Sequence, residues 1–255
     1  MNHQADDPTL GPPVQFCIVT AGRTGSTWLR LLLDSHPDIT CHGEVFGENL
    51  STLAAPGSDA HHGLLAERNA DPHGFLVRRV FAPSRCRAVG FKVLNRQLTQ
   101  RWPSLLDALR GEPGVRIVHL VRRNLLKRFV SEYFVGTVTH RHSARSSEAT
   151  ADVRPVRIPV ESVLADLSTV RREVDAMREA FRQHPMHEIA YEDCVSGPER
   201  ALGGLLGFLG VAPAPLGADI RKLLPDDLGK LVENLDELAT ALRGGPFEPM
   251  LGEAR

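Results

Sequence analysis

A run of small residues, Thr20-Ala21-Gly22-Arg23-Thr24-Gly25-Ser26-Thr27-Trp28, follows the first apolar stretch of the chain. Its glycines permit a tight turn that leaves backbone amides free, and a helix expected to begin near Thr27 adds the positive end of its dipole. Hydroxyl side chains and Arg23 supply further hydrogen-bond donors. The run therefore predicts a site that cradles a phosphate group. No lysine precedes the hydroxyl pair, so the run is not a Walker A motif.

A second candidate anion site follows another apolar stretch. Arg122-Arg123-Asn124 comes directly after residues 115–121, and Ser131 stands eight positions after Arg123. An arginine at the carboxyl end of a strand and a serine about two helical turns later can converge on one anion.

Together, the two motifs resemble those of sulfotransferases that use 3′-phosphoadenosine 5′-phosphosulfate (PAPS), and the trehalose-type bacterial carbohydrate branch is the most similar. GRTGSTW resembles the 5′-phosphosulfate loop of that family, with Arg23 where cytosolic members have lysine. Arg123 and Ser131 match the pair that holds the 3′-phosphate. The resemblance implies PAPS as cofactor, bound by Arg23, Thr24, Gly25, Ser26, Thr27, Trp28, Arg123 and Ser131.

Transfer of a sulfuryl group requires positioning and stabilisation of charge, as phosphoryl transfer does. Negative charge develops on the bridging oxygen of the departing 5′-phosphate, where a nearby cation has the largest effect. Arg23 and Lys92 are the candidate cations, and Lys92 in Gly90-Phe91-Lys92 is similar to a lysine on the equivalent strand of the family. We expect no metal in this chemistry, and the chain has no metal-ligand motif.

The acceptor hydroxyl must also lose a proton, and Glu44 is the predicted general base. Trehalose-type and heparan-type sulfotransferases use a glutamate in the corresponding region, whereas the positions at which cytosolic members carry a histidine hold none here. His42 remains the alternative, because imidazole has an ordinary pKa of about 6.5. Residues two apart in an extended segment share a face, so His42 could instead assist Glu44.

Alternating strand and helix patterns predict the fold class. Apolar runs indicate strands at residues 15–21, 88–94, 115–121 and, more weakly, 187–191. Helix patterns lie at residues 27–35, 102–110, 124–138 and 160–181. This order predicts an α/β, P-loop-like three-layer domain with a central parallel sheet of four to five strands and helices on both faces. Ligands of such sheets bind at the carboxyl ends of the strands, which most of the candidate residues follow.

The chain is expected to form one domain over residues 14–255, after a disordered tail at residues 1–13. Residues 47–72 and 136–159 contain many small or polar residues and are predicted to be mobile loops, of which either could close over a substrate.

Composition excludes several other classes of protein. Lys and Arg together number 30 against 31 for Asp and Glu, so no basic excess favours binding to nucleic acid. The apolar runs are far shorter than the roughly 20 residues that span a bilayer. The polar N-terminus resembles no signal peptide. A cytoplasmic location with reduced cysteines is the resulting expectation.

The predicted function is transfer of a sulfuryl group from PAPS to a hydroxyl of a small polar acceptor, such as a sugar, glycolipid or natural product, with release of adenosine 3′,5′-diphosphate. One alternative is a P-loop-like nucleotide kinase, although its lysine and metal-binding aspartate are missing. Another is a PAPS-binding protein without catalysis. Related bacterial enzymes include dimers, so the resemblance also allows a homodimer.

Overall fold

Five parallel strands form one sheet in the order β2-β3-β1-β4-β5. The computed structural model describes residues 11–47, 50–82, 85–139, 154–220, 222 and 224–252. The strands are β1 (Val14–Thr20), β2 (Ile39–His42), β3 (Ala88–Leu94), β4 (Arg116–Val121) and β5 (Met186–Ala190). The predicted α/β fold with a parallel sheet is confirmed. β2 has only four residues, too few for its alternation to stand out in the sequence.

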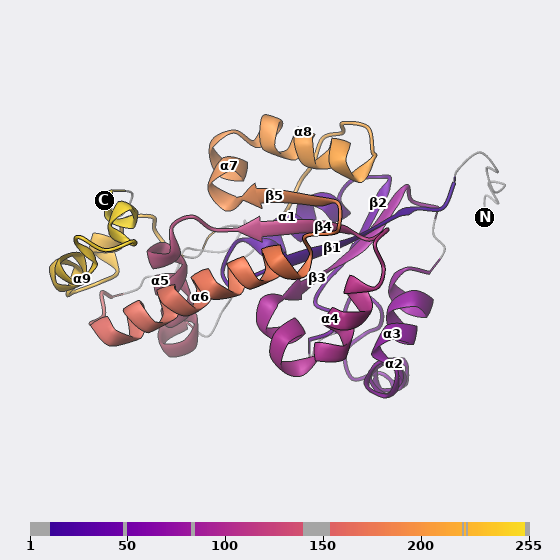
Figure 1. Ribbon diagram of the computed structural model, residues 1–255, viewed down its shortest axis with the longest axis horizontal. Coiled ribbons are helices and arrows are strands. Elements are labelled where there is room, and N and C mark those ends of the chain that lie inside the picture. The colour runs from indigo at the N-terminus through magenta and orange to yellow at the C-terminus, as the bar shows by residue number, and fades with distance from the viewer. Residues whose placement is uncertain are drawn as a thin grey trace.

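One face of the sheet is covered by α1 (Ser26–Asp34), α7 (Tyr191–Ser196) and α8 (Pro198–Leu209) (Figure 1). Phe16 and Ile18 of β1 lie on this face and belong to the same apolar cluster as Leu29 of α1 and Leu205 of α8. Side chains alternate between the two faces of a strand, so the intervening residues of β1 must pack on the other face.

The opposite face packs against α4 (Pro103–Arg110) and the end of α6 (Val160–Ala180), with α2 (Asp59–Ala70) and α3 (Pro72–Phe75) beside them (Figure 1). Cys17 and Val19 of β1 share this cluster with Leu105 of α4 and Met177 of α6. Two short π-helical turns, η1 (Leu76–Val80) and η2 (Gln97–Arg101), join these helices to the sheet. Helices on both faces complete the predicted three layers.

A third apolar cluster extends beyond the carboxyl ends of the strands. It joins α5 (Leu125–Phe134), the first half of α6 and α9 (Leu235–Leu242), at the end toward which the arrows of β4 and β5 point in Figure 1. The short turns η3 (Val135–Thr139), η4 (Leu228–Lys230) and η5 (Glu248–Leu251) complete this region. The cluster places α5 and the segment before α9 next to the strand ends.

One of the two predicted loops contains a helix. Residues 47–72 contain α2, whose N-cap Ser58 accepts a hydrogen bond from the His61 amide at 3.1 Å. Alanine and leucine in this stretch favour a helix once Ser58 caps its first turn. The small residues that precede Ser58 hide this helical pattern in the sequence. Most of the loop at residues 136–159 and most of the tail at residues 1–13 lie outside the described residues.

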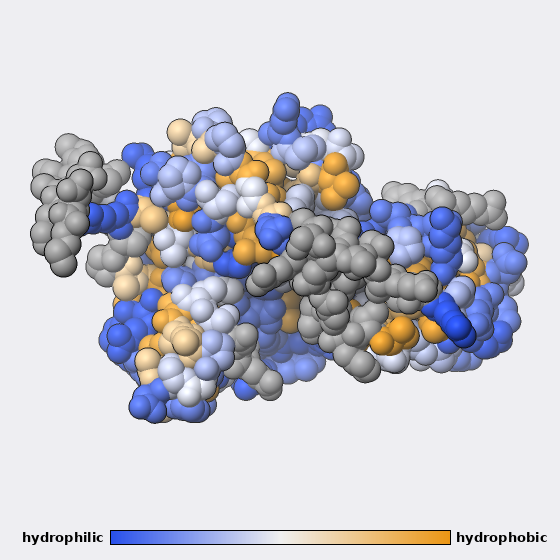
Figure 2. All heavy atoms as spheres, turned by 180° about the vertical axis from the view of Figure 1, so that it is seen from behind, coloured by the Kyte–Doolittle hydropathy of each residue, from blue (hydrophilic) through white to orange (hydrophobic). Residues whose placement is uncertain are grey.

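Polar residues cover much of the face seen in Figure 2, and the apolar residues there form scattered patches. Among the described residues, the exposed large apolar side chains are Val77, Val138 and Val195. No helix in the described part of the chain is both long enough and apolar enough to cross a membrane.

Candidate functional site

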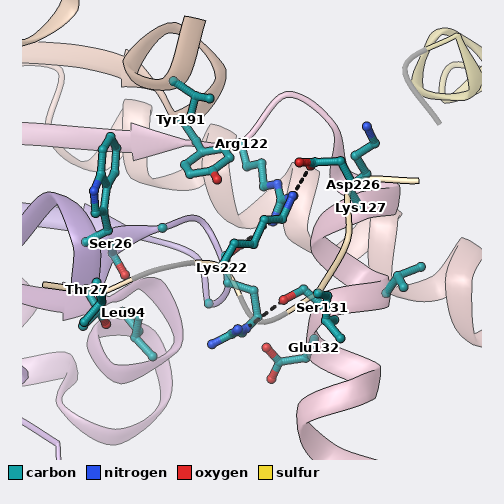
Figure 3. A pocket seen from close by; sticks show the side chains of 18 of the residues that line it. Ser26, Thr27, Leu94, Arg122, Lys127, Ser131, Glu132, Tyr191, Lys222 and Asp226 are labelled. Atoms are coloured by element: carbon teal, nitrogen blue, oxygen red, sulfur yellow. Dashed lines mark hydrogen bonds and ion pairs between the residues drawn. The ribbon is translucent and has the colours of Figure 1, made fainter. Parts of the chain in front are cut away.

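A cavity of about 500 Å³ opens at the carboxyl ends of the strands, and most of its polar wall is drawn in Figure 3. Its wall comes from the turn after β1, the ends of β3, β4 and β5, α5, and residues of the segment before α9, namely Ile220, Lys222, Leu224, Pro225, Asp226, Leu228 and Leu231. After β1 the chain adds β2 and β3 on one side of β1, and it then crosses to add β4 and β5 on the other side. The cavity lies at this change of direction, at the carboxyl end of β1. Such a crevice is the expected ligand site of an open parallel sheet.

The turn after β1 adopts a backbone that brings its polar groups to the cavity. Arg23 and Gly25 both have left-handed backbone angles, with φ of 63° and 82°. The cavity is lined by five residues of this turn, Gly22, Arg23, Gly25, Ser26 and Thr27. This is the stretch from which the sequence predicts a phosphate site. Glycine at position 25 is also required by space, because a Cβ there would lie 2.5 Å from the ring of Tyr191.

Thr24 has a different position from its neighbours in the turn. Its buried hydroxyl donates to the Ala21 carbonyl oxygen at 3.0 Å and contacts the Thr20 hydroxyl at 2.5 Å. Both bonds hold the turn to the end of β1. The Thr24 side chain therefore shapes the turn from within and does not line the cavity.

Two aromatic rings form one wall of the cavity. Trp28 of α1 and Tyr191 of α7 meet edge to face with ring centroids 6.3 Å apart. Tyr191 was not among the predicted site residues, although it directly follows β5 at the same sheet edge. Burial raises the pKa of its phenol. The paired rings offer a surface against which a flat group such as a nucleobase can pack.

Ser131, predicted to hold the 3′-phosphate together with Arg123, instead contacts Arg23 of the phosphate turn. Nε of Arg23 donates to Oγ of Ser131 at 3.1 Å, and the dashed line at Ser131 in Figure 3 marks this bond. Burial lowers the pKa of Arg23, whereas the carboxylate of Glu132 opposes that shift. The loop and α5 thus present a cation and a hydroxyl to the same part of the cavity.

Lys92 and Glu44 form an ion pair in the cavity wall. Nζ of Lys92, at the end of β3, lies 2.7 Å from Oε1 of Glu44 and donates to the Thr27 hydroxyl at 3.1 Å. The Lys92 side chain is 6% exposed and that of Glu44 is 33% exposed. The predicted cation and the predicted base are therefore in direct contact at the phosphate turn.

His42 does not line the cavity. It is the last residue of β2, is half-buried, and has a pKa that burial lowers, with Asp34 and Arg30 of α1 as its charged neighbours. The chain turns after β2, with the Gly47 amide donating to the Glu44 carbonyl oxygen at 2.7 Å. Strand alternation stops before Glu44, so the expectation of a shared face does not hold.

Arg123 also lies outside this cavity. Its guanidinium pairs with both carboxylate oxygens of Asp193, at 2.7 and 2.5 Å, on an exposed part of the surface. Arg122 lines the cavity instead, buried, with Nη1 donating to the Arg23 carbonyl oxygen at 3.0 Å and the guanidinium 5.0 Å from the Tyr191 ring centroid. Neighbouring residues at the end of β4 point in opposite directions, which spacing to Ser131 does not reveal.

Further cations that the sequence prediction missed line the same side of the cavity as Arg122. Lys127 comes from the first turn of α5, and Lys222 forms an ion pair with Asp226 (Figure 3). Burial lowers the pKa of Lys222, and Asp226 opposes that shift. Lys127 stands four positions before Ser131 on α5, a helical spacing that could have indicated it. Lys222 lies in a segment without periodicity, where no such signal exists.

Within the described ranges, no group of three His, Cys, Asp or Glu side chains is placed to hold a metal ion. Cys17, Cys41 and Cys194 are buried thiols outside any disulfide.

Comparison with known proteins shows similarity to one family. Nodulation protein H of Rhizobium meliloti strain 1021 is 28% identical over 239 residues, which are 92% of this chain and 94% of that protein. Nodulation protein H of Rhizobium tropici is 25% identical over 244 residues, 94% of this chain and 93% of that protein. These matches do not single out the trehalose-type branch.

Solved structures show the same fold. A sulfotransferase from Alicyclobacillus acidocaldarius superposes with a TM-score of 0.52 at 20% identity, covering 96% of this chain and 94% of that one. The sulfotransferase domain of the curacin biosynthetic pathway gives a TM-score of 0.53 at 19% identity, covering 81% and 77%. Residues 15–215 match the sulfotransferase family, and the chain is therefore an enzyme of that family.

Proposed function

We propose that the cavity binds PAPS and that the protein transfers its sulfuryl group to a hydroxyl of a small polar acceptor, releasing adenosine 3′,5′-diphosphate. The observation that carries this proposal is the presence of two clusters of cationic side chains in one cavity. Lys92 and Arg23 lie at the phosphate turn, and Arg122, Lys127 and Lys222 lie across from Thr27 and Leu94 (Figure 3). A ligand with two separate anionic groups fits this arrangement, and family membership favours PAPS over a nucleoside triphosphate.

The environment of Arg122 supports a bound anion. The residue is 8% exposed, and its Nε is buried without a hydrogen-bond partner among the described residues. Leaving a buried donor unsatisfied costs free energy, so an acceptor from a ligand is expected there. Burial also lowers the pKa of Arg122, and nearby Tyr191, Glu192 and Asp226 oppose that shift.

The contacts at the phosphate turn suggest how transfer proceeds. PAPS supplies the sulfuryl group when bound. Glu44 accepts the proton of the acceptor hydroxyl as the new oxygen–sulfur bond forms and the bond to the 5′-phosphate breaks. Lys92 and Arg23 stabilise the negative charge that the departing phosphate oxygen gains. In this proposal, a proton acceptor 2.7 Å from Lys92 is the feature that distinguishes an enzyme from a PAPS-binding protein without catalysis.

Affinity for nucleotides tests the proposed donor and the role of Arg122. Adenosine 3′,5′-diphosphate is expected to bind at least about 10-fold more tightly than AMP, because the 3′-phosphate gains charge-assisted hydrogen bonds. Arg122→Met is expected to remove most of this preference. Isothermal titration of both nucleotides measures it.

Arg123→Met is the matched control, since its guanidinium pairs with Asp193 outside the cavity. Equal affinity of the native protein for AMP and the 3′,5′-diphosphate would overturn PAPS as donor. A loss of preference in Arg123→Met alone would restore the pairing that the sequence predicted.

The wall around Glu44 favours a polar acceptor. Leu94, Arg96 and Glu132 line this part of the cavity, and Arg96 lies 4.0 Å from Glu132. Covering such charges with an apolar ring system would desolvate them without compensation, whereas hydroxyl groups can replace water as partners.

Sulfation of a panel of acceptors with labelled PAPS tests this class. Sugars, glycolipids and hydroxylated polar metabolites are expected to accept the label at rates above those of phenols and sterols. Transfer to phenols or sterols alone would refute the polar acceptor while leaving the donor assignment intact.

A further inference from the structure

We propose that Gln97 and Arg68 are positioning residues that hold Glu44 against the reacting hydroxyl. The proposal rests on the assignment of Glu44 as general base. Neither residue lines the cavity, and neither belongs to a motif that the sequence made visible. Their hydrogen bonds to the turn that carries Glu44 are the basis for the inference.

Gln97 binds the Glu44 carboxylate directly. Its Nε2 donates to Oε2 of Glu44 at 3.0 Å, and its Oε1 accepts from the Leu94 amide at 2.9 Å. The carboxamide therefore links the carboxylate to the end of β3, the same strand that carries Lys92. Lys92 holds the other oxygen of Glu44, so both oxygens have partners from one strand and the turn after it.

The two partners of Glu44 differ in what happens when the donor binds. Lys92 is attracted to an anion at the phosphate turn, because its ammonium group already contacts Thr27 there. Gln97 is neutral and lies outside the cavity, so its bond to Glu44 is expected to persist. Gln97 then orients the carboxylate while Lys92 interacts with the donor.

Arg68 of α2 holds the backbone immediately after Glu44. Its Nη1 donates to the carbonyl oxygens of Val45 at 3.1 Å and Gly47 at 2.5 Å. The guanidinium is 5.1 Å from the ring centroid of Trp102, whose Nε1 donates to the Phe46 carbonyl oxygen at 2.8 Å. Three successive carbonyl groups thus accept hydrogen bonds from this pair.

A buried guanidinium is expensive to place, and this one is 2% exposed. Its bonds go to main-chain carbonyl groups of the Glu44 turn and to Asn69. Arg68 of α2 therefore supports the Glu44 turn from within a stretch that the sequence predicted to be a mobile loop. Displacing a catalytic group by about 1 Å can reduce a rate by about 100-fold, so such support has a kinetic consequence.

Gln97→Met removes the hydrogen bond while keeping the side-chain length. It is expected to lower kcat about 10-fold, with the acceptor KM and the affinity for adenosine 3′,5′-diphosphate changed less than about twofold. Thr99→Val is the matched control, because Thr99 lies in the same helical turn, is exposed, and bonds to the Asn95 carbonyl oxygen instead. Steady-state kinetics and titration of the nucleotide give these values.

Arg68→Met is expected to lower kcat to a similar extent, and Arg68→Lys to recover part of the loss, since an ammonium group can donate to one of the two carbonyl oxygens. Arg79→Met is the control, because Arg79 pairs with Glu67 on the surface. Thermal melting identifies any variant that fails to fold. If Arg68→Met fails to fold, the kcat values of Gln97→Met and Arg68→Lys still test the proposal.

Native kcat in Gln97→Met would overturn the proposal, and so would a loss of kcat matched by an equal loss of nucleotide affinity. Glu44→Gln separates this failure from failure of the base assignment. If Glu44→Gln is inactive while Gln97→Met and Arg68→Lys are native, Glu44 is the base and needs no such support. If Glu44→Gln retains turnover, the base assignment itself is wrong.

Discussion

Replacing Glu44 by glutamine is expected to lower kcat by about 100-fold or more, the usual contribution of a general base. The amide has the same shape but cannot accept the proton of the acceptor hydroxyl. It also loses the ion pair with Lys92, whereas the contact with Gln97 can be kept. Affinity for adenosine 3′,5′-diphosphate is expected to stay nearly unchanged, because Glu44 faces the acceptor. Single-turnover rates and nucleotide titration separate these two quantities.

Two variants control for this result. Glu132→Gln changes another carboxylate of the cavity wall, which lies beside Gly22 and 4.0 Å from Arg96, and is expected to have a smaller effect on kcat. His42→Ala is also expected to cost less, since His42 lies outside the cavity. An active Glu44→Gln together with an inactive His42→Ala would reverse the assignment of the base.

Replacing Lys92 by methionine is expected to lower kcat about 100- to 1,000-fold, the range observed when a charge-stabilising group is removed from a reaction centre. Lys92 is buried, so little water screens its charge, and it contacts both the phosphate turn and Glu44. The variant is measured with the same transfer assay. A kcat within about threefold of the native value would contradict the role assigned to Lys92.

The effects of Lys92→Met and Glu44→Gln are not expected to add. Each variant breaks the same ion pair, and residues that act as a unit lose most of their joint contribution when either one is removed. The double variant is therefore expected to lose less than the product of the two single losses. Lys127→Met, across the cavity, serves as the independent partner in a second cycle, for which additivity is expected.

The sequence by itself determined the fold class and the position of the phosphate turn. Strong apolar runs predicted three strands, and the weaker run at residues 187–191 predicted the fourth, found as β5. The turn after β1 was recognisable because its chemistry is local: small residues, two glycines and a following helix stand together in the chain. Family membership, confirmed by comparison, rests on the same stretch and on the order of segments after it.

Only the tertiary structure decided which side chains reach the cavity. Arg122 and Arg123 are neighbours with the same chemistry, and the choice between them depends on strand direction and on Asp193, which captures Arg123. Thr24 has the residue type of its neighbours but is turned inward onto Thr20. Lys222 and Tyr191 reach the cavity from segments far from the phosphate turn in sequence. Gln97 and Arg68 likewise support Glu44 from distant parts of the chain. Such contacts are set by packing of the sheet and helices, which no local pattern encodes.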